Sequence, residues 1–310
     1  MSVIRLLDAA ADRAVEGLRV IEDYTRFVLN DRFLTEKLKT FRHQLVELLS
    51  IVPFESRLNS RETQYDVGTS ITLASEQRRE DFATILRANF SRLQEALRSL
   101  EESAKCAFPT IASGLEQLRY QSYTLQKAVQ NLAQKATAPR RQTLASVRWQ
   151  DIETDDNICP HSNGPSTDWL FLSDDGASPT VPKPLSDREK YRLGILWKYR
   201  SQTANRKILV ENRIDLAHAI EAHGVLLDQK SLPVFAARDV LNPGVLVGVR
   251  VRCETEAQQA ILDAADFIVP SNSKYCPNLD YEPEVDIVHE PVWLTGLTIP
   301  IWIIRSNVKQ

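Results

Sequence analysis

Arginine and glutamate residues recur at the same spacing in two stretches of this 310-residue chain. In Leu7–Arg26 they occupy positions 13, 16, 19 and 22, and in Leu86–Lys105, which lies 79 residues later, they occupy positions 92, 95, 98 and 101. Guanidinium groups bind phosphate oxygens through paired hydrogen bonds, and carboxylates orient arginines or hold a divalent metal. One interpretation is that arginines from both copies meet at a phosphate-bearing ligand.

The alternative interpretation of these charges is structural. Residues three and four apart on a helix form ion pairs worth only ~0.2–0.5 kcal/mol each, and most charges in such patterns are solvated. The pattern alone therefore favours exposed helix faces. The recurrence of the charges together with the apolar positions favours a shared site, and both interpretations stay open at this point.

The elements that carry these charges read as two copies of one helical unit. Seven of the twenty aligned positions are identical, against roughly one expected if ~20 residue types matched at random. An apolar stripe with spacings of three and four runs through each copy, at positions 7, 11, 14, 18, 21 and 25 and at 86, 90, 93, 97, 100 and 104. The segments that follow echo each other too, with Arg42 and Gln44 aligned to Arg119 and Gln121. We therefore predict a duplicated helical hairpin with an approximate twofold axis.

Composition excludes several classes of protein. The formal charge of −3 gives no sign of a nucleic-acid partner or of an acidic membrane surface. No apolar run reaches the ~18–20 residues that cross a bilayer, and the first residues lack the pattern of a signal peptide. The four cysteines share no metal-ligand spacing. We expect a cytoplasmic protein with no nucleic-acid and no membrane partner.

The composition and the apolar pattern divide the chain into three parts. Residues 1–134 read as an all-helical domain, and residues 135–167 are polar, rich in Pro, Gly and Ser, and read as a linker. From residue 168 to 310, short apolar runs alternate with helical stretches, which predicts an α/β domain of buried parallel strands. Six strands are expected, near residues 169–173, 208–210, 225–227, 245–251, 267–269 and 301–304.

The stretch from Arg5 to Phe27, RLLDAAADRAVEGLRVIEDYTRF, resembles a helical domain that some bacteria fuse N-terminally to thiamine-phosphate synthase. The resemblance extends through the Asp66-Val67-Gly68-Thr69 loop, Asn89 and Leu118-Arg119-Tyr120, with one departure at Ala10, where the family tends to have Asn. It implies phosphorylation of hydroxymethylpyrimidine phosphate by ATP with Mg²⁺. The expected catalytic residues are Arg13, Arg19, Arg92 and Arg98; the substrate-binding residues are Asp66, Gly68, Asn89 and Arg119; and the metal-binding residues are Glu16 and Glu95.

The second half is similar to thiamine-phosphate synthase itself, a (β/α)8 barrel, most clearly over residues 208–238. The site positions depart from the family: Glu211-Asn212 stands for Asn-Asp, Leu226 for His, and the Gly-Val-Ser-Thr loop becomes Gly248-Val249-Arg250-Val251. A strand carrying Gln-Leu-Arg has no counterpart between Ser173 and Ile208, and the final glycines are replaced by Arg305-Ser306. Because these sites lie at strand ends, we expect no synthase activity. Six strands cannot close in the eight-stranded geometry, so we expect an incomplete TIM-barrel-like fold, an open or partly closed α/β layer.

Three functions follow from these observations. The first is a thiamine-biosynthesis protein whose helical domain phosphorylates a pyrimidine phosphate, with arginines stabilising the transferred charge. The second is a non-catalytic protein of that pathway that binds a phosphorylated pyrimidine or a partner. The third is a thiamine-phosphate synthase that is still active with a rebuilt site. The barrel half could also serve as the surface of a homo-oligomer.

Overall fold

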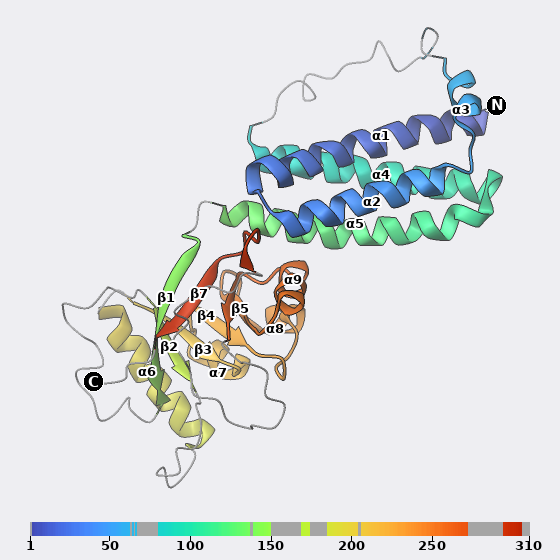
Figure 1. Ribbon diagram of the computed structural model, residues 1–310. Helices are drawn as coiled ribbons and strands as arrows, with labels where there is room; N and C mark the ends of the chain where they lie inside the picture. Colours follow the sequence, from blue (N-terminus) through green and yellow to red (C-terminus); the bar gives the residue numbers. More distant parts are fainter. Residues whose placement is uncertain are drawn as a thin grey trace. The chain divides into compact units, whose positions relative to one another are not determined.

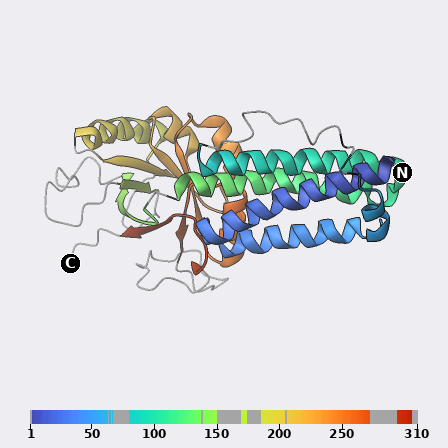
Figure 2. The same cartoon turned by 90° about the horizontal axis from the view of Figure 1, so that it is seen from above.

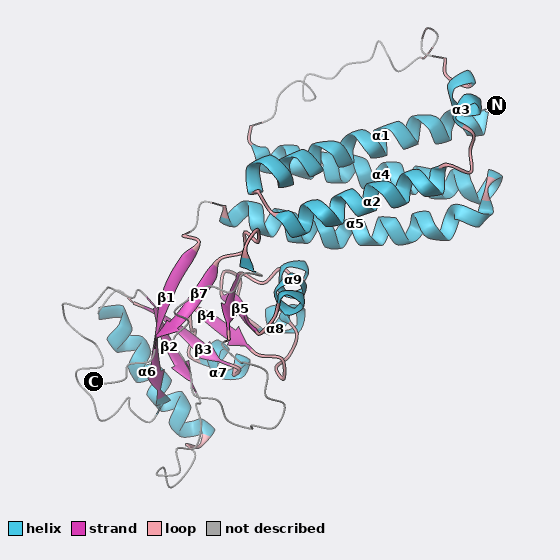
Figure 3. Cartoon of the chain, in the orientation of Figure 1, coloured by secondary structure: helices cyan, strands magenta, loops and turns pink. Residues whose placement is uncertain are grey.

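The computed structural model describes residues 2–62, 64, 66, 80–136, 139–149, 169–173, 185–203, 206–271 and 294–305. These residues form two compact units (Figure 1), one made of Met1–Ala136 with Gly296–Thr298 and the other of Thr137–Thr295 with Ile299–Gln310. The described secondary structure of the first unit is helical, and the strands lie in the second (Figure 3). This separation confirms the predicted fold class. No described helix is long and apolar enough to cross a membrane.

Four long helices make up most of the helical unit. They run side by side in both views (Figures 1 and 2) and are α1 (Ser2–Tyr24), α2 (Arg32–Leu49), α4 (Phe82–Ala107) and α5 (Pro109–Lys135). A π-helical turn η1 (Thr25–Leu29) extends α1, and the short α3 (Phe54–Asn59) follows α2. Asn30 ends the first helix in a left-handed conformation, with φ of 54°. The Asp31 carboxylate then accepts a hydrogen bond from the backbone N–H of Leu34 at 2.8 Å and begins α2.

Both predicted apolar stripes face the core of this unit. All twelve positions are buried, from Leu7 in α1 to Thr25 at the start of η1 and from Leu86 to Ala104 in α4. The two helices run antiparallel (Figure 1) and approach closely at Gly17, where an added Cβ would lie 3.1 Å from the carbonyl oxygen of Asn89. The position aligned with Gly17 in the second copy is Ala96, also small and buried. Small residues at a helix crossing let the two backbones approach, so the repeat encodes the packing of α1 on α4.

The second unit is a closed barrel of seven parallel strands in the order β1-β2-β3-β4-β5-β6-β7. The strands are β1 (Arg141–Arg148), β2 (Trp169–Ser173), β3 (Lys207–Glu211), β4 (Gly224–Leu227), β5 (Leu246–Val251), β6 (Phe267–Pro270) and β7 (Ile301–Arg305). The prediction of an open or partly closed layer is therefore wrong, whereas the seven strands confirm the prediction of an incomplete TIM-barrel-like fold. The strand that was missed is β1, which lies in the stretch predicted to be a linker and pairs with both β2 and β7.

Helices follow several of the strands at the predicted places. They are α6 (Asp187–Thr203), α7 (Ile214–Ala219), α8 (Val234–Val240) and α9 (Glu254–Leu262). The barrel interior is filled by large side chains, including Trp169, Phe171, Phe267 and Trp302. The rings of Phe267 and Trp302 stack with centroids 3.7 Å apart. A Cβ added at Gly248 would lie 2.1 Å from the Phe267 ring, so this glycine makes room for the stack. The interior is a packed core, and polar chemistry is confined to the strand ends.

Candidate functional site

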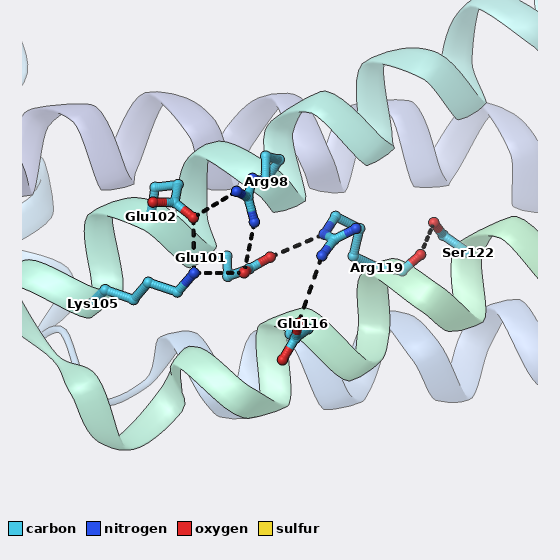
Figure 4. Close-up of polar contacts among 7 residues, drawn as sticks. All are labelled: Arg98, Glu101, Glu102, Lys105, Glu116, Arg119 and Ser122. Atoms are coloured by element: carbon cyan, nitrogen blue, oxygen red, sulfur yellow. Dashed lines mark hydrogen bonds and ion pairs between the residues drawn. The ribbon is translucent and has the colours of Figure 1, made fainter.

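Each helical hairpin buries one glutamate–arginine pair at matched positions. In the first hairpin, Nε of Arg42 on α2 donates to Glu22 on α1 at 3.0 Å. In the second, Nε of Arg119 on α5 donates to Glu101 on α4 at 2.9 Å (Figure 4). Both glutamates are buried, with exposed fractions of 5% for Glu22 and 1% for Glu101. The matched pairs show that the two hairpins pack in the same way, as the predicted duplication requires.

The pair in the second hairpin lies in a larger cluster of charges. Arg98 and Lys105 each donate to Glu101 at 2.9 Å, and Lys105 also donates to Glu102 at 2.8 Å (Figure 4). Burial alone raises the pKa of Glu101, but the hydrogen bonds from Lys105 and Arg119 outweigh it and hold the pKa at about 2. The Arg119 guanidinium also lies over the Tyr120 ring, 4.6 Å from its centroid. This carboxylate is therefore ionised at neutral pH.

The predicted catalytic residues lie on exposed helix faces. Arg19 pairs with Glu22 at 3.6 Å, and Arg98 pairs with Glu101 and with Glu102 at 3.0 Å. Arg13, Arg92 and the predicted metal ligand Glu16 are exposed and form no ion pair with another described residue, while Glu95 accepts a hydrogen bond from Ser91. These local pairs are those that the structural interpretation expects for Arg19 and Arg98. A ligand shared by all four arginines stays a prediction.

Three of the predicted substrate-binding residues contact different described residues of the helical unit. Arg119 belongs to the buried pair, and Asp66 accepts from Arg5 at 3.4 Å. Asn89 is 8% exposed; its Nδ2 donates to the carbonyl oxygen of Ile85, and its Oδ1 has no partner in the described part of the chain. Gly68 lies outside the described residues.

A third ion pair of the helical unit, in which only the carboxylate is buried, is absent from the repeat. Arg61 binds the buried Asp8 through both carboxylate oxygens, at 2.6 and 3.1 Å, and Asp12 at 2.8 Å. Hydrogen bonding to Asp8 raises the pKa of Arg61, so the guanidinium is always charged. These contacts tie the segment after α3 to α1. The repeat does not predict this pair, because the position aligned with Asp8 is Arg87.

At the C-terminal ends of β3 and β4, three polar side chains converge. Nδ2 of Asn212 donates to Asp228 at 2.9 Å, and the Ser231 hydroxyl donates to Asn212 Oδ1 at 2.7 Å and lies 2.8 Å from Asp228 Oδ1. Asn212 adopts a left-handed conformation, with φ of 53°, which turns it toward Asp228. Burial raises the pKa of Asp228, but hydrogen bonds from Ser231, the Lys230 backbone and Asn212 lower it overall. The cluster thus holds an ionised carboxylate with two neutral oxygen groups.

A groove of about 410 Å³ adjoins this cluster. Asp228 and Ser231 line it together with Val234 of α8 and with Glu256 and Gln259 of α9. Next to the cluster, the barrel mouth holds a buried ion pair in which Nη2 of Arg250 on β5 lies 2.5 Å from Glu211 on β3. Gln229 Nε2 donates to the carbonyl oxygen of Arg250 at 3.4 Å, which connects the loop after β4 to β5.

The oxygen atoms of Asp228, Asn212 and Ser231 suit Mg²⁺ only in combination with a phosphorylated substrate. Mg²⁺ prefers oxygen ligands and is commonly held by one or two carboxylates plus substrate phosphates. The described residues contain no group of three or more His, Cys, Asp or Glu side chains that could hold a metal by themselves. A metal brought in with a diphosphate therefore fits this rim better than a permanently bound one.

The fold and this site define a barrel protein whose polar groups gather at the C-terminal ends of parallel strands, with a duplicated helical unit before it. Residues 5–128 match the model of the ThiD2 family, and residues 182–284 match the model of thiamine monophosphate synthase. The chain is 34% identical to the thiamine-phosphate synthase of Rhodopirellula baltica over 279 residues, which cover 86% of this chain and 71% of that relative.

A thiamine-phosphate synthase from Synechocystis is 32% identical over 277 residues, covering 86% of this chain and 74% of the relative. The thiamine phosphate pyrophosphorylase of Pyrococcus furiosus is a solved structure with a TM-score of 0.34 and 17% identity, covering 43% of this chain and 61% of that one. On the sequence matches, the chain belongs to the thiamine-phosphate synthase family, which places it in thiamine biosynthesis.

Sequence reasoning missed Asp228 and Ser231 as site residues. It did notice that Asn212 and Arg250 depart from the family pattern. The family stretch Gly-Val-His-Leu-Gly-Gln reads Gly-Val-Leu-Leu-Asp-Gln here, so the Asp228 carboxylate replaces a glycine. A carboxylate in place of a glycine, directly after a predicted strand, could have indicated this cluster from the sequence.

Proposed function

We propose that this chain is a thiamine-phosphate synthase whose substrate-binding rim has been rebuilt. The observation that carries the proposal is the convergence of Asp228, Asn212 and Ser231 at the C-terminal ends of β3 and β4, beside a groove. Parallel barrels place their catalytic groups at this end of the strands. The sequence similarity over both units supports the same activity.

The reaction joins a pyrimidine diphosphate to a thiazole phosphate. The bond between the pyrimidine methylene carbon and the diphosphate oxygen breaks, the electron pair leaves with the diphosphate, and the thiazole nitrogen bonds to the carbon. Mg²⁺, when bound, would neutralise charge on the leaving diphosphate. Asp228 would hold the metal–diphosphate complex, and Asn212 and Ser231 would orient the Asp228 carboxylate.

Purified full-length protein given both substrates and Mg²⁺ tests the proposal. We expect thiamine phosphate to form, and Asp228→Asn to lower kcat/KM by about 10²-fold because a preorganised charge is removed. Asp239→Asn changes an exposed carboxylate on α8 and should leave the rate unaltered. If the wild-type protein forms no thiamine phosphate above the uncatalysed rate, the substitutions at the strand ends have abolished the activity, as the sequence alone led us to expect.

A second activity, phosphorylation of a pyrimidine phosphate by ATP, is favoured by the charges of the helical unit that no ion pair explains. Arg13, Glu16 and Arg92 recur with the repeat and are exposed, without ion-pair partners in the described part of the chain. Arg92 of the second copy lies close to the first copy at the helix crossing. A Cβ added at Gly17 would lie 3.9 Å from Cβ of Arg92. Glu16 directly precedes this crossing.

ATP consumption by the full chain with hydroxymethylpyrimidine phosphate tests this second activity. We expect Arg92→Ala to lower the rate by about 10²–10³-fold if Arg92 stabilises the transferred charge. Arg87→Ala is the matched control, since Arg87 lies on the same helix outside the repeated set. An absence of ATP turnover in the wild-type protein would leave the recurring charges as solvated helix faces.

A further inference from the structure

A short segment of the C-terminal half of the chain is part of the helical unit. Residues Gly296–Thr298 group with Met1–Ala136, whereas the residues on either side of this segment belong to the barrel unit. Thr298 lies three residues before Ile301, at which β7 begins. The helical unit therefore holds the chain immediately before the last strand of the barrel.

The buried carboxylate of Asp31 makes the main contact with this segment. Its Oδ2 atom accepts hydrogen bonds from the backbone N–H of Thr298 at 2.9 Å and from the Thr298 hydroxyl at 2.7 Å. Asp31 is 1% exposed. Next to it, the backbone N–H of Arg32 donates to the carbonyl oxygen of Gly296 at 2.8 Å. Gly296 has a φ of 88°, and a Cβ added there would lie 3.2 Å from Cβ of Arg32, so a glycine suits this close approach.

The contact with Thr298 is more than a helix cap requires. The other carboxylate oxygen of Asp31, Oδ1, caps α2 by accepting from the backbone N–H of Leu34 at 2.8 Å. Asp81 caps α4 in the same way, with Oδ1 accepting from the backbone N–H of Thr84 at 2.7 Å, but Asp81 is exposed. One carboxylate oxygen is thus sufficient for the cap, and the second oxygen of Asp31 serves the segment before β7.

Strand β7 gains from such an anchor because its connection to the preceding strand is long. From the end of β6 at Pro270 to Ile301, the chain runs through residues 271–300, and a long connection restricts where a strand begins less than a short one. Among the described residues, β6 and β7 share the single register pair Ile268–Ile301. Five register pairs join β7 to β1 and close the barrel. A fixed point just before Ile301 shortens the free connection to two residues.

We infer that Asp31 is a latch through which the helical unit fixes the start of β7 and keeps the pairing of β1 with β7 closed. β1 begins six residues after the end of α5, and β7 begins three residues after Thr298. Both strands of the closing pair therefore follow the helical unit directly in the chain. Release of Thr298 would lengthen the free connection before β7 and let this pair open locally. Such a latch acts whichever activity the protein has.

Substitution of Asp31 by asparagine separates the two tasks of its carboxylate. Asparagine caps a helix as well as aspartate does, but its Nδ2 atom cannot accept a hydrogen bond from the Thr298 backbone N–H. Hydrogen–deuterium exchange of the full-length protein, followed by mass spectrometry of its peptides, is the measurement. We expect Asp31→Asn to raise the exchange rate of the β7 amides on the order of tenfold, because hydrogen bonds to a charged group are lost. Asp81→Asn, the same change at the cap of α4, should leave this rate at the wild-type value.

A second variant tests the latch without touching the cap. Thr298→Val removes the hydroxyl and keeps the backbone hydrogen bond, so the exchange of β7 should rise by a smaller factor, roughly threefold. Wild-type exchange of β7 in both Asp31→Asn and Thr298→Val would overturn the inference. An equal rise in Asp31→Asn and Asp81→Asn would overturn it too, because loss of charge at either cap would then explain the effect. If Asp31→Asn does not fold, as judged by circular dichroism, Thr298→Val alone decides.

Discussion

The two helical hairpins bury the same ion pair in different surroundings. Glu101 forms ion pairs with Arg119, Arg98 and Lys105, each at 2.9 Å (Figure 4). Glu22 forms ion pairs with Arg42 at 3.0 Å and with Arg19 at 3.6 Å. Arg26, the counterpart of Lys105, instead lies over the Phe27 ring at 4.8 Å. The buried pair is therefore the shared element of the repeat, and the exposed charges around it differ between the copies.

This difference suggests two separate reasons why charged residues recur in the repeat, helix packing and ligand binding. Glu22 with Arg42, and Glu101 with Arg119, recur because each pair joins the two helices of its hairpin inside the core. The exposed residues of the repeat have no such packing role. Only their recurrence points to a ligand, and experiments that remove charges one copy at a time can test the distinction.

The largest expected effect comes from removing the arginines that neutralise the buried glutamates. Among the described residues, Arg42→Met leaves buried Glu22 with only the 3.6 Å contact to Arg19, so we expect a loss of about 3–5 kcal/mol in the free energy of unfolding. Arg119→Met should cost clearly less, because Arg98 and Lys105 still neutralise Glu101. Urea unfolding followed by circular dichroism measures both.

A charge-free version of the first pair provides the control for that comparison. Glu22→Gln/Arg42→Met removes both charges, and buried pairs replaced in this way often cost little. We expect the double variant to recover most of the stability lost in Arg42→Met. Equal losses in Arg42→Met and Arg119→Met would show that the surroundings of the two pairs do not differ in energy.

The helical unit could be predicted in detail because its information is local and repeated. Apolar spacing predicted the buried faces of α1 and α4, and the repeat aligned Arg42 with Arg119. The repeat could not show that Arg42 and Arg119 each pair with a buried glutamate on the neighbouring helix. Spacing along one helix does not say which side chain of a neighbouring helix lies opposite.

The barrel was harder to predict because its contacts are distant in the sequence. The buried strands β2 to β7 were found from short apolar runs, but β1, with the sequence RQTLASVR, has too few apolar residues to stand out from a polar segment. Because this strand was missed, we expected an open or partly closed layer in place of the closed barrel. Glu211 and Arg250 lie 39 residues apart, and Asn212 and Asp228 lie 16 apart, so only the strand order brings them together.

A smaller effect is expected from pH. The Glu101 pKa is about 2 in the folded protein against an ordinary value of 4.5, so the carboxylate stabilises the fold above pH 4.5 and loses that contribution as the pH falls from about 4.5 to about 2. Thermal unfolding midpoints across this window measure the loss. In Glu101→Gln the fall of the midpoint with decreasing pH should be shallower than in the wild-type protein. Identical pH profiles would contradict a depressed pKa at this residue.

The smallest effect is expected from the half-exposed arginines that accompany the buried pairs. Arg98 and Arg19 are exposed by 55% and 54%, so solvent screens their ion pairs. We expect Arg98→Ala to cost about 1 kcal/mol or less, because it contacts both Glu101 and Glu102. Arg19→Ala should cost roughly 0.2 kcal/mol, given its single longer contact.

Urea unfolding at low and at roughly 1 M salt measures the difference between the two variants, which screening by salt should remove. A loss above about 2 kcal/mol that persists in salt would mean that Arg98 is part of the buried cluster itself, and the distinction between buried pair and exposed charge would then fail in the second hairpin.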